Sequence, residues 1–91
     1  LVFVPNQWAL KSVYNALQSY ETVIPKQVGL LGFNNTDWTD LPVKSISTIV
    51  EPVYEEGYAA CKMLLKRIKN PSLEPDHKLL TCKLNWLKST I

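Results

Sequence analysis

Hydrogen-bonding side chains, most of them uncharged, follow directly on a short hydrophobic run. The run "LLGF" ends at residue 33, and Asn34, Asn35, Thr36 and Asp37 come next. In an open α/β sheet, ligands bind at the carboxyl ends of parallel strands, so this cluster is a candidate small-molecule site. Asparagine is also common in turns, because its side chain bonds locally and it tolerates left-handed backbone. From the residues alone, a binding site and a simple turn both stay open.

The elements around this cluster predict that it has a neighbour. "LVFVP" at residues 1–5 has the pattern of a buried strand, and Asn6 stands where a helix N-cap belongs. Apolar residues at helical spacing predict a helix over residues 6–19, and "QVGLLGF" at 27–33 predicts a second buried strand. A βαβ unit of this kind brings the ends of both strands to one edge. We therefore expect Asn6 and Asn34 to lie near each other.

The rest of the chain predicts a second round of the same pattern. "SISTIV" at residues 45–50 is expected to be a third strand, and Pro52 suits the first turn of a helix that ends at about residue 69. An extended segment is expected over residues 77–87, with Trp86 in the core. The helix has an apolar stripe that we expect to pack on a sheet: Val53, Gly57, Ala60, Cys61, Leu64, Leu65 and Ile68.

Composition argues against several functional classes. The 91 residues fall short of the roughly 100–150 of a typical domain, so we expect part of a larger one. A formal charge of +2 is too small to indicate a nucleic-acid-binding surface, and no apolar run approaches the roughly 20 residues of a membrane span. Cys61 and Cys82 are expected to be core thiols in a reducing cytoplasm, and with His77 as the only histidine we expect no metal site.

No set of residues that could perform catalysis stands out. The sequence offers no Ser-His-Asp, Cys-His or paired-carboxylate arrangement, so we expect no enzyme and no cofactor. A phosphate- or nucleotide-binding enzyme of flavodoxin-like fold would need a glycine-rich phosphate loop, which is not found here. The basic turn that contains Lys66, Arg67 and Lys69 is interpreted as a solvated helix end rather than a DNA contact.

Four blocks of the chain, in this order and spacing, are similar to one known family. They read "FVPNQWALKSVYNAL", "IPKQVGLLGFNNTDW", "STIVEPVYEEGYAACKMLLKRI" and "LLTCKLNWLKST". Together they resemble the end of the sugar-sensing domain of the LacI/GalR family of bacterial transcriptional repressors. The resemblance implies an α/β fold with a parallel sheet, built from the βαβ units of part of a periplasmic-binding-protein-like (flavodoxin-like) sensor. Such a sensor has two subdomains and holds its effector in the cleft between them.

The resemblance also implies a division of the chain and a set of partners. Residues 1–48 would belong to the C-terminal sensor subdomain, residues 49–79 would form the crossover and helix of the N-terminal subdomain, and residues 80–91 would return as a strand. The implied protein is a cytoplasmic homodimer that binds a sugar or sugar derivative. It would contact operator DNA through a helix-turn-helix that this chain does not carry. A periplasmic-type sugar-binding protein of a transporter is the alternative, although "PVYEEG" and "LKST" match the regulators better.

The family pattern assigns roles to individual positions. Its first Asp after "GF", which commonly accepts hydrogen bonds from effector hydroxyls, falls on Asn34, and its Gln before the last helix falls on Glu51. The Asp of its "AND" motif falls on Asn6, so the resemblance implies these three as effector-binding residues. Asn34 replaces an acceptor-only carboxylate with a group that also donates, whereas Glu51 adds a charge and removes a donor. A turn, a solvent-facing residue and a helix cap are the simpler interpretations of Asn34, Glu51 and Asn6.

Two tryptophans invite a sugar-stacking interpretation, but the resemblance favours a subunit interface. Trp8 and Leu10 lie on the helix that family members use for dimer contacts, and the loop at residues 37–43, which includes Trp38, lies beside it. We therefore expect Trp8, Leu10 and Trp38 at a dimer interface.

Overall fold

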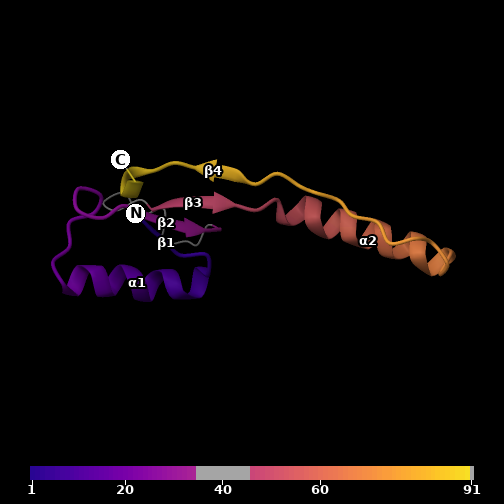
Figure 1. Ribbon diagram of the computed structural model, residues 1–91, viewed down its shortest axis with the longest axis horizontal. Coiled ribbons are helices and arrows are strands. Elements are labelled where there is room, and N and C mark those ends of the chain that lie inside the picture. Colours follow the sequence, from indigo (N-terminus) through magenta and orange to yellow (C-terminus); the bar gives the residue numbers. More distant parts are fainter. Residues whose placement is uncertain (35–45, 91) are drawn as a thin grey trace. The chain divides into compact units, whose positions relative to one another are not determined.

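The computed structural model describes residues 1–34 and 46–90, and its elements are labelled in Figure 1. The chain divides into two compact units. The sheet unit comprises Leu1–Glu51 and Lys83–Ile91, and the helical unit comprises Pro52–Cys82. In chain order the elements are β1 (Val2–Phe3), α1 (Gln7–Ser19), β2 (Leu30–Phe33), β3 (Ser47–Val50), α2 (Val53–Lys69), β4 (Lys83–Asn85) and the short 3-10 helix η2 (Lys88–Thr90).

The described strands of the sheet unit form one sheet in the order β1-β2-β3-β4. β1, β2 and β3 run parallel, and Val2 lies opposite Leu30. β4 runs antiparallel to β3, so that Ile49 lies opposite Leu84. The expected parallel α/β arrangement is confirmed for the first three strands. The returning tail was expected as a strand but without a stated direction, and its antiparallel pairing makes the described sheet a mixed one.

Helix α1 lies along one face of this sheet (Figure 1). The buried core consists of Val4, Leu10, Leu30 and Ile46. Leu10 packs directly over Gly32, where an added Cβ would lie 2.5 Å from Leu10 Cδ2. Burying a leucine side chain contributes about 1.5–3 kcal/mol. The contact between Leu10 and Gly32 therefore holds the helix close to the middle of β2.

Hydrogen bonds mark both ends of α1, and the one at Asn6 is the cap that the sequence predicts. Asn6 is the N-cap, and its Oδ1 accepts a hydrogen bond from the Trp8 backbone N–H at 2.8 Å. At the other end, the Tyr20 backbone N–H donates to the Ala16 carbonyl at 3.2 Å. Because the first backbone N–H groups of a helix lack intrahelical partners, a side-chain cap fixes where the helix begins. The helix predicted over residues 6–19 is confirmed.

The C-terminal turn is fastened to the sheet by buried hydroxyl groups. Ser89 Oγ accepts a hydrogen bond from the Ser47 backbone N–H at 2.8 Å and donates to the Leu30 carbonyl at 2.5 Å. Ser47 Oγ accepts from the Leu87 backbone N–H at 2.7 Å. Ser47 and Ser89 are buried, and buried polar groups of this kind need such partners. The tail thus bridges β2 and β3 at their first residues.

Helix α2 carries opposite charges at its two ends. Glu55 and Glu56 lie in its first turn, and its last turn is basic, which suits the helix dipole. Pro52 occupies the N-cap position, one residue before the first turn in which it was expected. Among the described residues, no helix is long and apolar enough to cross a membrane.

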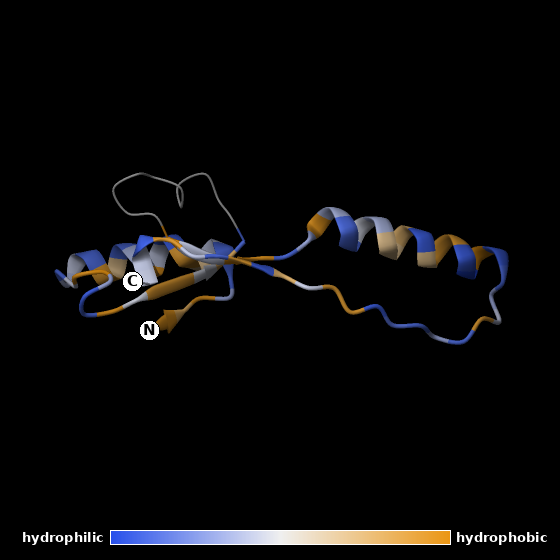
Figure 2. Cartoon of the chain, turned by 90° about the horizontal axis from the view of Figure 1, so that it is seen from above, coloured by the Kyte–Doolittle hydropathy of each residue, from blue (hydrophilic) through white to orange (hydrophobic). Residues whose placement is uncertain are grey.

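The apolar stripe of α2 does not pack on a sheet in this chain. Val53 is 63% exposed, Leu64 57% and Ile68 63%, and Figure 2 shows apolar residues recurring along this helix. The expectation of a covered stripe is therefore wrong for the described residues, because the helical unit contains only α2 and an irregular return segment.

Three more residues that were expected in the core are exposed. Cys61 and Cys82 are both exposed free thiols, since each belongs to the helical unit, where no sheet covers them. Trp86 is 50% exposed because it follows β4, the strand at the edge of the sheet. A hydrophobic residue type alone did not decide burial at these positions.

The contact between Leu10 and Gly32 makes a testable prediction about stability. Replacing Gly32→Ala should lower the free energy of unfolding by about 1–3 kcal/mol, because Leu10 must move to make room. In a Leu10→Ala background the same change should cost much less, since the obstructing Cδ atoms are gone. Chemical denaturation of the four proteins measures both costs. Equal costs in the two backgrounds would show that this contact does not set the position of α1.

Candidate functional site

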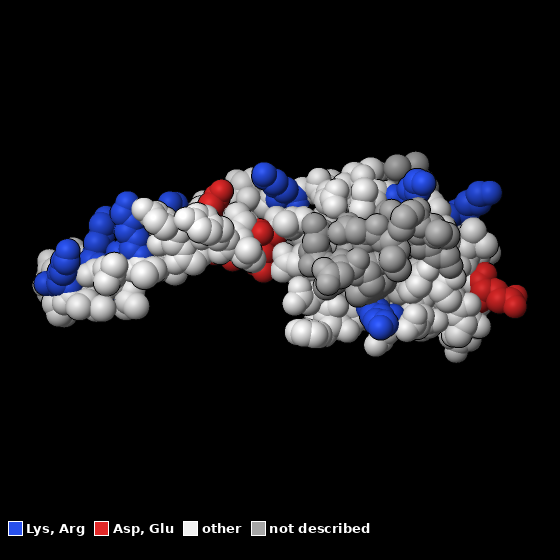
Figure 3. Space-filling model, turned by 180° about the vertical axis from the view of Figure 1, so that it is seen from behind, with Lys and Arg blue, Asp and Glu red and all other residues white. Residues whose placement is uncertain are grey.

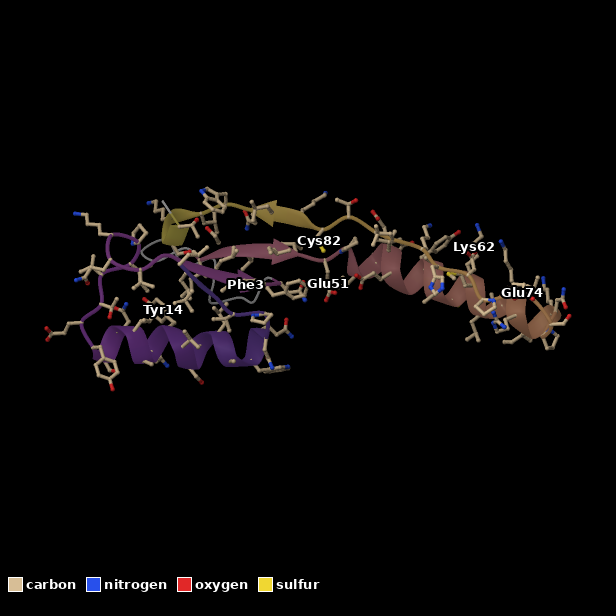
Figure 4. The ribbon with its side chains drawn as sticks, in the orientation of Figure 1. Phe3, Tyr14, Glu51, Lys62, Glu74 and Cys82 are labelled. Atoms are coloured by element: carbon tan, nitrogen blue, oxygen red, sulfur yellow. The ribbon has the colours of Figure 1, made fainter. Side chains whose placement is uncertain are left out.

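Two of the polar residues that follow strand ends are hydrogen-bonded to each other. Asn34 Nδ2 donates to Glu51 Oε1 at 2.7 Å, and the Glu51 backbone N–H donates to Asn34 Oδ1 at 3.1 Å. Asn34 directly follows β2. Glu51 directly follows β3 and is labelled in Figure 4. The pair, here called the Asn34–Glu51 clasp, therefore joins two adjacent parallel strands at their carboxyl ends.

The backbone of Asn34 explains why this residue type stands here. Its φ is 65°, in the left-handed region that asparagine adopts more readily than most side-chain-bearing residues. Its backbone N–H donates to the Ile49 carbonyl at 2.6 Å, which continues the pairing of β2 with β3 by one more bond. The turn interpretation of Asn34 therefore holds for its backbone. Its side chain is still placed to reach across to the next strand.

The clasp has a definite hydrogen-bonding polarity. The amide oxygen of Asn34 accepts from the Glu51 backbone, so its NH₂ group must face the carboxylate. A carboxylate only accepts hydrogen bonds and has about four acceptor positions. One bond from Asn34 leaves Glu51 able to accept others from a ligand. The carboxylate of this partly buried pair is suited to hydroxyl and amino groups.

Asn6 follows β1, which lies beside β2, so it belongs to the same edge of the sheet as Asn34. Its side-chain oxygen, Oδ1, is engaged in capping α1. The cap interpretation is confirmed, and in the described part of the chain no hydrogen bond joins Asn6 to the clasp. Its expected contact with an effector stays a prediction.

The three residues expected at a dimer interface have different outcomes. Trp8 is 83% exposed on α1, so it is available for a partner. Leu10 is fully buried, and its assignment to the subunit surface is wrong because its side chain is in the core over Gly32. Trp38 lies outside the described residues. The dimer itself stays a prediction.

Sequence reasoning predicted that the acidic group had moved from the position of Asn34 to Glu51, but it did not predict that the two side chains bond to each other. A signal was present in the resemblance. The family's carboxylate and amide become an amide at residue 34 and a carboxylate at residue 51. After this exchange, one amide N–H donor still faces one carboxylate. These are the two groups of the observed hydrogen bond between Asn34 and Glu51. Complementary changes at two positions are the expected mark of side chains in contact.

The helical unit contains a hollow, and the guanidinium of Arg67 in its lining is engaged in holding the chain. It is lined by the end of α2 and the segment after it, including Met63, Leu73 and Pro75. The Arg67 guanidinium donates to the carbonyls of Leu73 and Glu74 at 3.1 and 3.3 Å. Figure 3 shows Lys and Arg side chains gathered toward this end of the unit. In residues 1–34 and 46–90 no cluster of His, Cys, Asp and Glu side chains could hold a metal ion.

Comparison with curated proteins finds regulators. The chain is 31% identical over 77 residues to the HTH-type transcriptional regulator RegA of Clostridium saccharobutylicum, which covers 85% of this chain and 23% of that protein. It is 29% identical over 80 residues to the ribose operon repressor of Escherichia coli strain K12, which covers 88% and 24%. The chain therefore spans about a quarter of the length of these relatives.

Comparison with solved structures finds the same fold. The chain resembles a LacI family transcriptional regulator from Enterococcus faecium with bound ribose, with a TM-score of 0.78 and 29% identity over 98% of this chain and 33% of that one. A transcriptional regulator from Bacillus cereus subsp. cytotoxis has a TM-score of 0.86 at 24% identity, which shows the fold alone, over 98% and 32%. Residues 1–90 match the family described as periplasmic binding protein-like domain. The chain therefore belongs to the family of periplasmic binding protein-like domains, and the relatives to which it is similar are transcriptional regulators.

Proposed function

We propose that this chain is part of the effector-binding and dimerisation domain of a LacI-type transcriptional repressor that senses a sugar or sugar-derived molecule. The clasp is the observation that carries the proposal, because it presents acceptor groups at the edge of a parallel sheet where α/β proteins bind ligands. The names of the relatives favour a regulator over a transport protein. The ribose-bound regulator supports a sugar as the ligand class.

We assign residues 1–48 and 80–91 to the C-terminal sensor subdomain and residues 49–79 to the N-terminal one. The division of the chain into a sheet unit and a helical unit supports this assignment. The exposed apolar stripe of α2 supports it as well, because further segments of a longer sensor would cover such a face. In this proposal the clasp stands where the chain passes from one unit to the other, since Glu51 is the last residue of the sheet unit before Pro52.

The proposed mechanism is linkage between two binding events. Effector hydroxyls donate to Glu51 and exchange hydrogen bonds with Asn34, and Asn6 lines the same edge. Binding favours one arrangement of the two subdomains, and that arrangement changes the affinity of a helix-turn-helix outside this chain for operator DNA. Effector and operator then alter each other's affinity by the same factor. The regulator would act in the cytoplasm, and no catalytic step is involved.

The effector role of Asn34 can be tested in the regulator that contains this chain. Asn34→Ala should weaken binding of the effector by about 1–3 kcal/mol, because a partly buried polar group of the site or of the effector loses its hydrogen-bond partner. D-ribose is the first probe, followed by other pentoses and hexoses, in calorimetric titrations. Asn34→Gly is the matched control, since glycine suits the positive φ but also lacks the amide. Both variants should lose effector affinity alike, whereas operator affinity without effector should barely change. Undiminished sugar binding in both would remove Asn34 from the site.

The proposed dimer can be tested through Trp8, which is the exposed member of the expected interface. Buried interface tryptophans often contribute 2 kcal/mol or more, so Trp8→Ala should shift the regulator towards monomer by roughly thirtyfold or more in dissociation constant. Sedimentation velocity over a concentration series measures the shift. Tyr20→Ala is the control, because Tyr20 caps the far end of α1 and is 84% exposed. If Trp8→Ala leaves the dimer as tight as Tyr20→Ala does, α1 is not the interface.

A further inference from the structure

We propose that Glu51 makes the effector site select against anionic ligands, so that the effector is a neutral sugar or an amino sugar rather than a sugar phosphate or a sugar acid. This inference rests on the proposed function, because it takes the clasp to be part of the effector site. It adds the charge of the ligand, which the proposed function leaves open.

The first support is that the carboxylate of Glu51 is held in place. Its Oε1 accepts from Asn34 Nδ2, and the backbone N–H of the same residue donates to Asn34 Oδ1. Turning the amide over would place its oxygen against the carboxylate and its NH₂ against a backbone donor. The amide therefore has one workable orientation, and it fixes where the negative charge lies.

The second support is that the fixing group does not neutralise the charge. The described partner of the carboxylate is a neutral amide, which orients Glu51 without supplying a positive charge. Partial burial lowers the local dielectric and strengthens the effect of the remaining charge on a nearby ligand. A second anion placed beside this carboxylate would be repelled, whereas hydroxyl and ammonium groups would be attracted.

The size of the discrimination follows from Coulomb's law. Two like charges about 6 Å apart near a protein surface disfavour each other by roughly ten- to a hundredfold in a binding constant, with the lower figure at physiological salt. A neutral sugar and its phosphate ester share every hydroxyl donor except the esterified one. They should therefore differ in affinity mainly through this charge.

The test uses two variants of the full regulator that separate charge from shape. Glu51→Gln keeps the size of the side chain and removes its charge. The exchanged variant, Asn34→Asp with Glu51→Gln, restores one carboxylate facing one amide and so restores the negative charge. Calorimetry compares ring-matched probes: D-ribose with D-ribose 5-phosphate, and D-glucose with D-glucosamine, D-glucuronate and D-glucose 6-phosphate.

The tightest probe for the wild type should be neutral or aminated, with its anionic counterpart at least tenfold weaker. Glu51→Gln should narrow this gap by roughly tenfold, and the exchanged variant should open it again. Glu51→Gln could bind neither member of a pair. In that case, recovery of neutral-sugar binding in the exchanged variant supports a role for the negative charge in the site, and absence of that recovery contradicts it.

An anionic probe that binds the wild type most tightly would overturn the inference and leave the proposed sugar sensor intact. The inference would also be overturned if Glu51→Gln left the difference in affinity between neutral and anionic probes unchanged. Failure of every sugar in the panel to bind the wild type would instead overturn the proposed function, and the inference with it.

Discussion

The reciprocal hydrogen bonds between Asn34 and Glu51 are the constraint on which the proposed site depends. They join the ends of β2 and β3 through one amide that faces both a carboxylate and a backbone N–H. Because Glu51 is the last residue of the sheet unit before Pro52, the same pair fixes the point from which the chain departs into the helical unit. Strand pairing, the positive φ of Asn34 and the placement of a negative charge therefore come from a single local arrangement.

The rest of the sheet unit keeps this edge in position from two sides. At the opposite ends of β2 and β3, Ser89 bridges the first residues of both strands. On the helix-covered face, Leu10 rests on Gly32, two residues before Asn34 in the chain. Both contacts limit how far β2 can move relative to its neighbours. A binding residue at the end of β2 thus stands on a supported strand, which favours a site of defined geometry.

Much of the fold could be predicted from local sequence patterns. The predictions were wrong or incomplete where contacts between distant residues determine burial or pairing. The N-cap at Asn6 and the helix after it depend on residues close in sequence, so they could be predicted. The burial of Leu10 could not be separated from surface exposure by helical spacing, because it depends on a glycine 22 positions away. Trp86 and Cys82 were placed in a core from residue type, yet one follows an edge strand and the other lies in a unit without a sheet. Predicting the clasp would have required knowing that two residues 17 positions apart in the sequence are in contact.

The central claim is that Asn34 and Glu51 act as one unit, and a double-mutant cycle of unfolding free energy tests it most directly. Asn34→Asp alone would place the new carboxylate within hydrogen-bond distance of the Glu51 carboxylate. This should lower the free energy of unfolding by about 1–3 kcal/mol. Glu51→Gln alone should cost less, because an amide oxygen can still accept from Asn34. Combining the two changes should recover at least about 1 kcal/mol relative to the sum of the single costs, since a donor faces a carboxylate again. Strict additivity of the two costs would contradict the clasp.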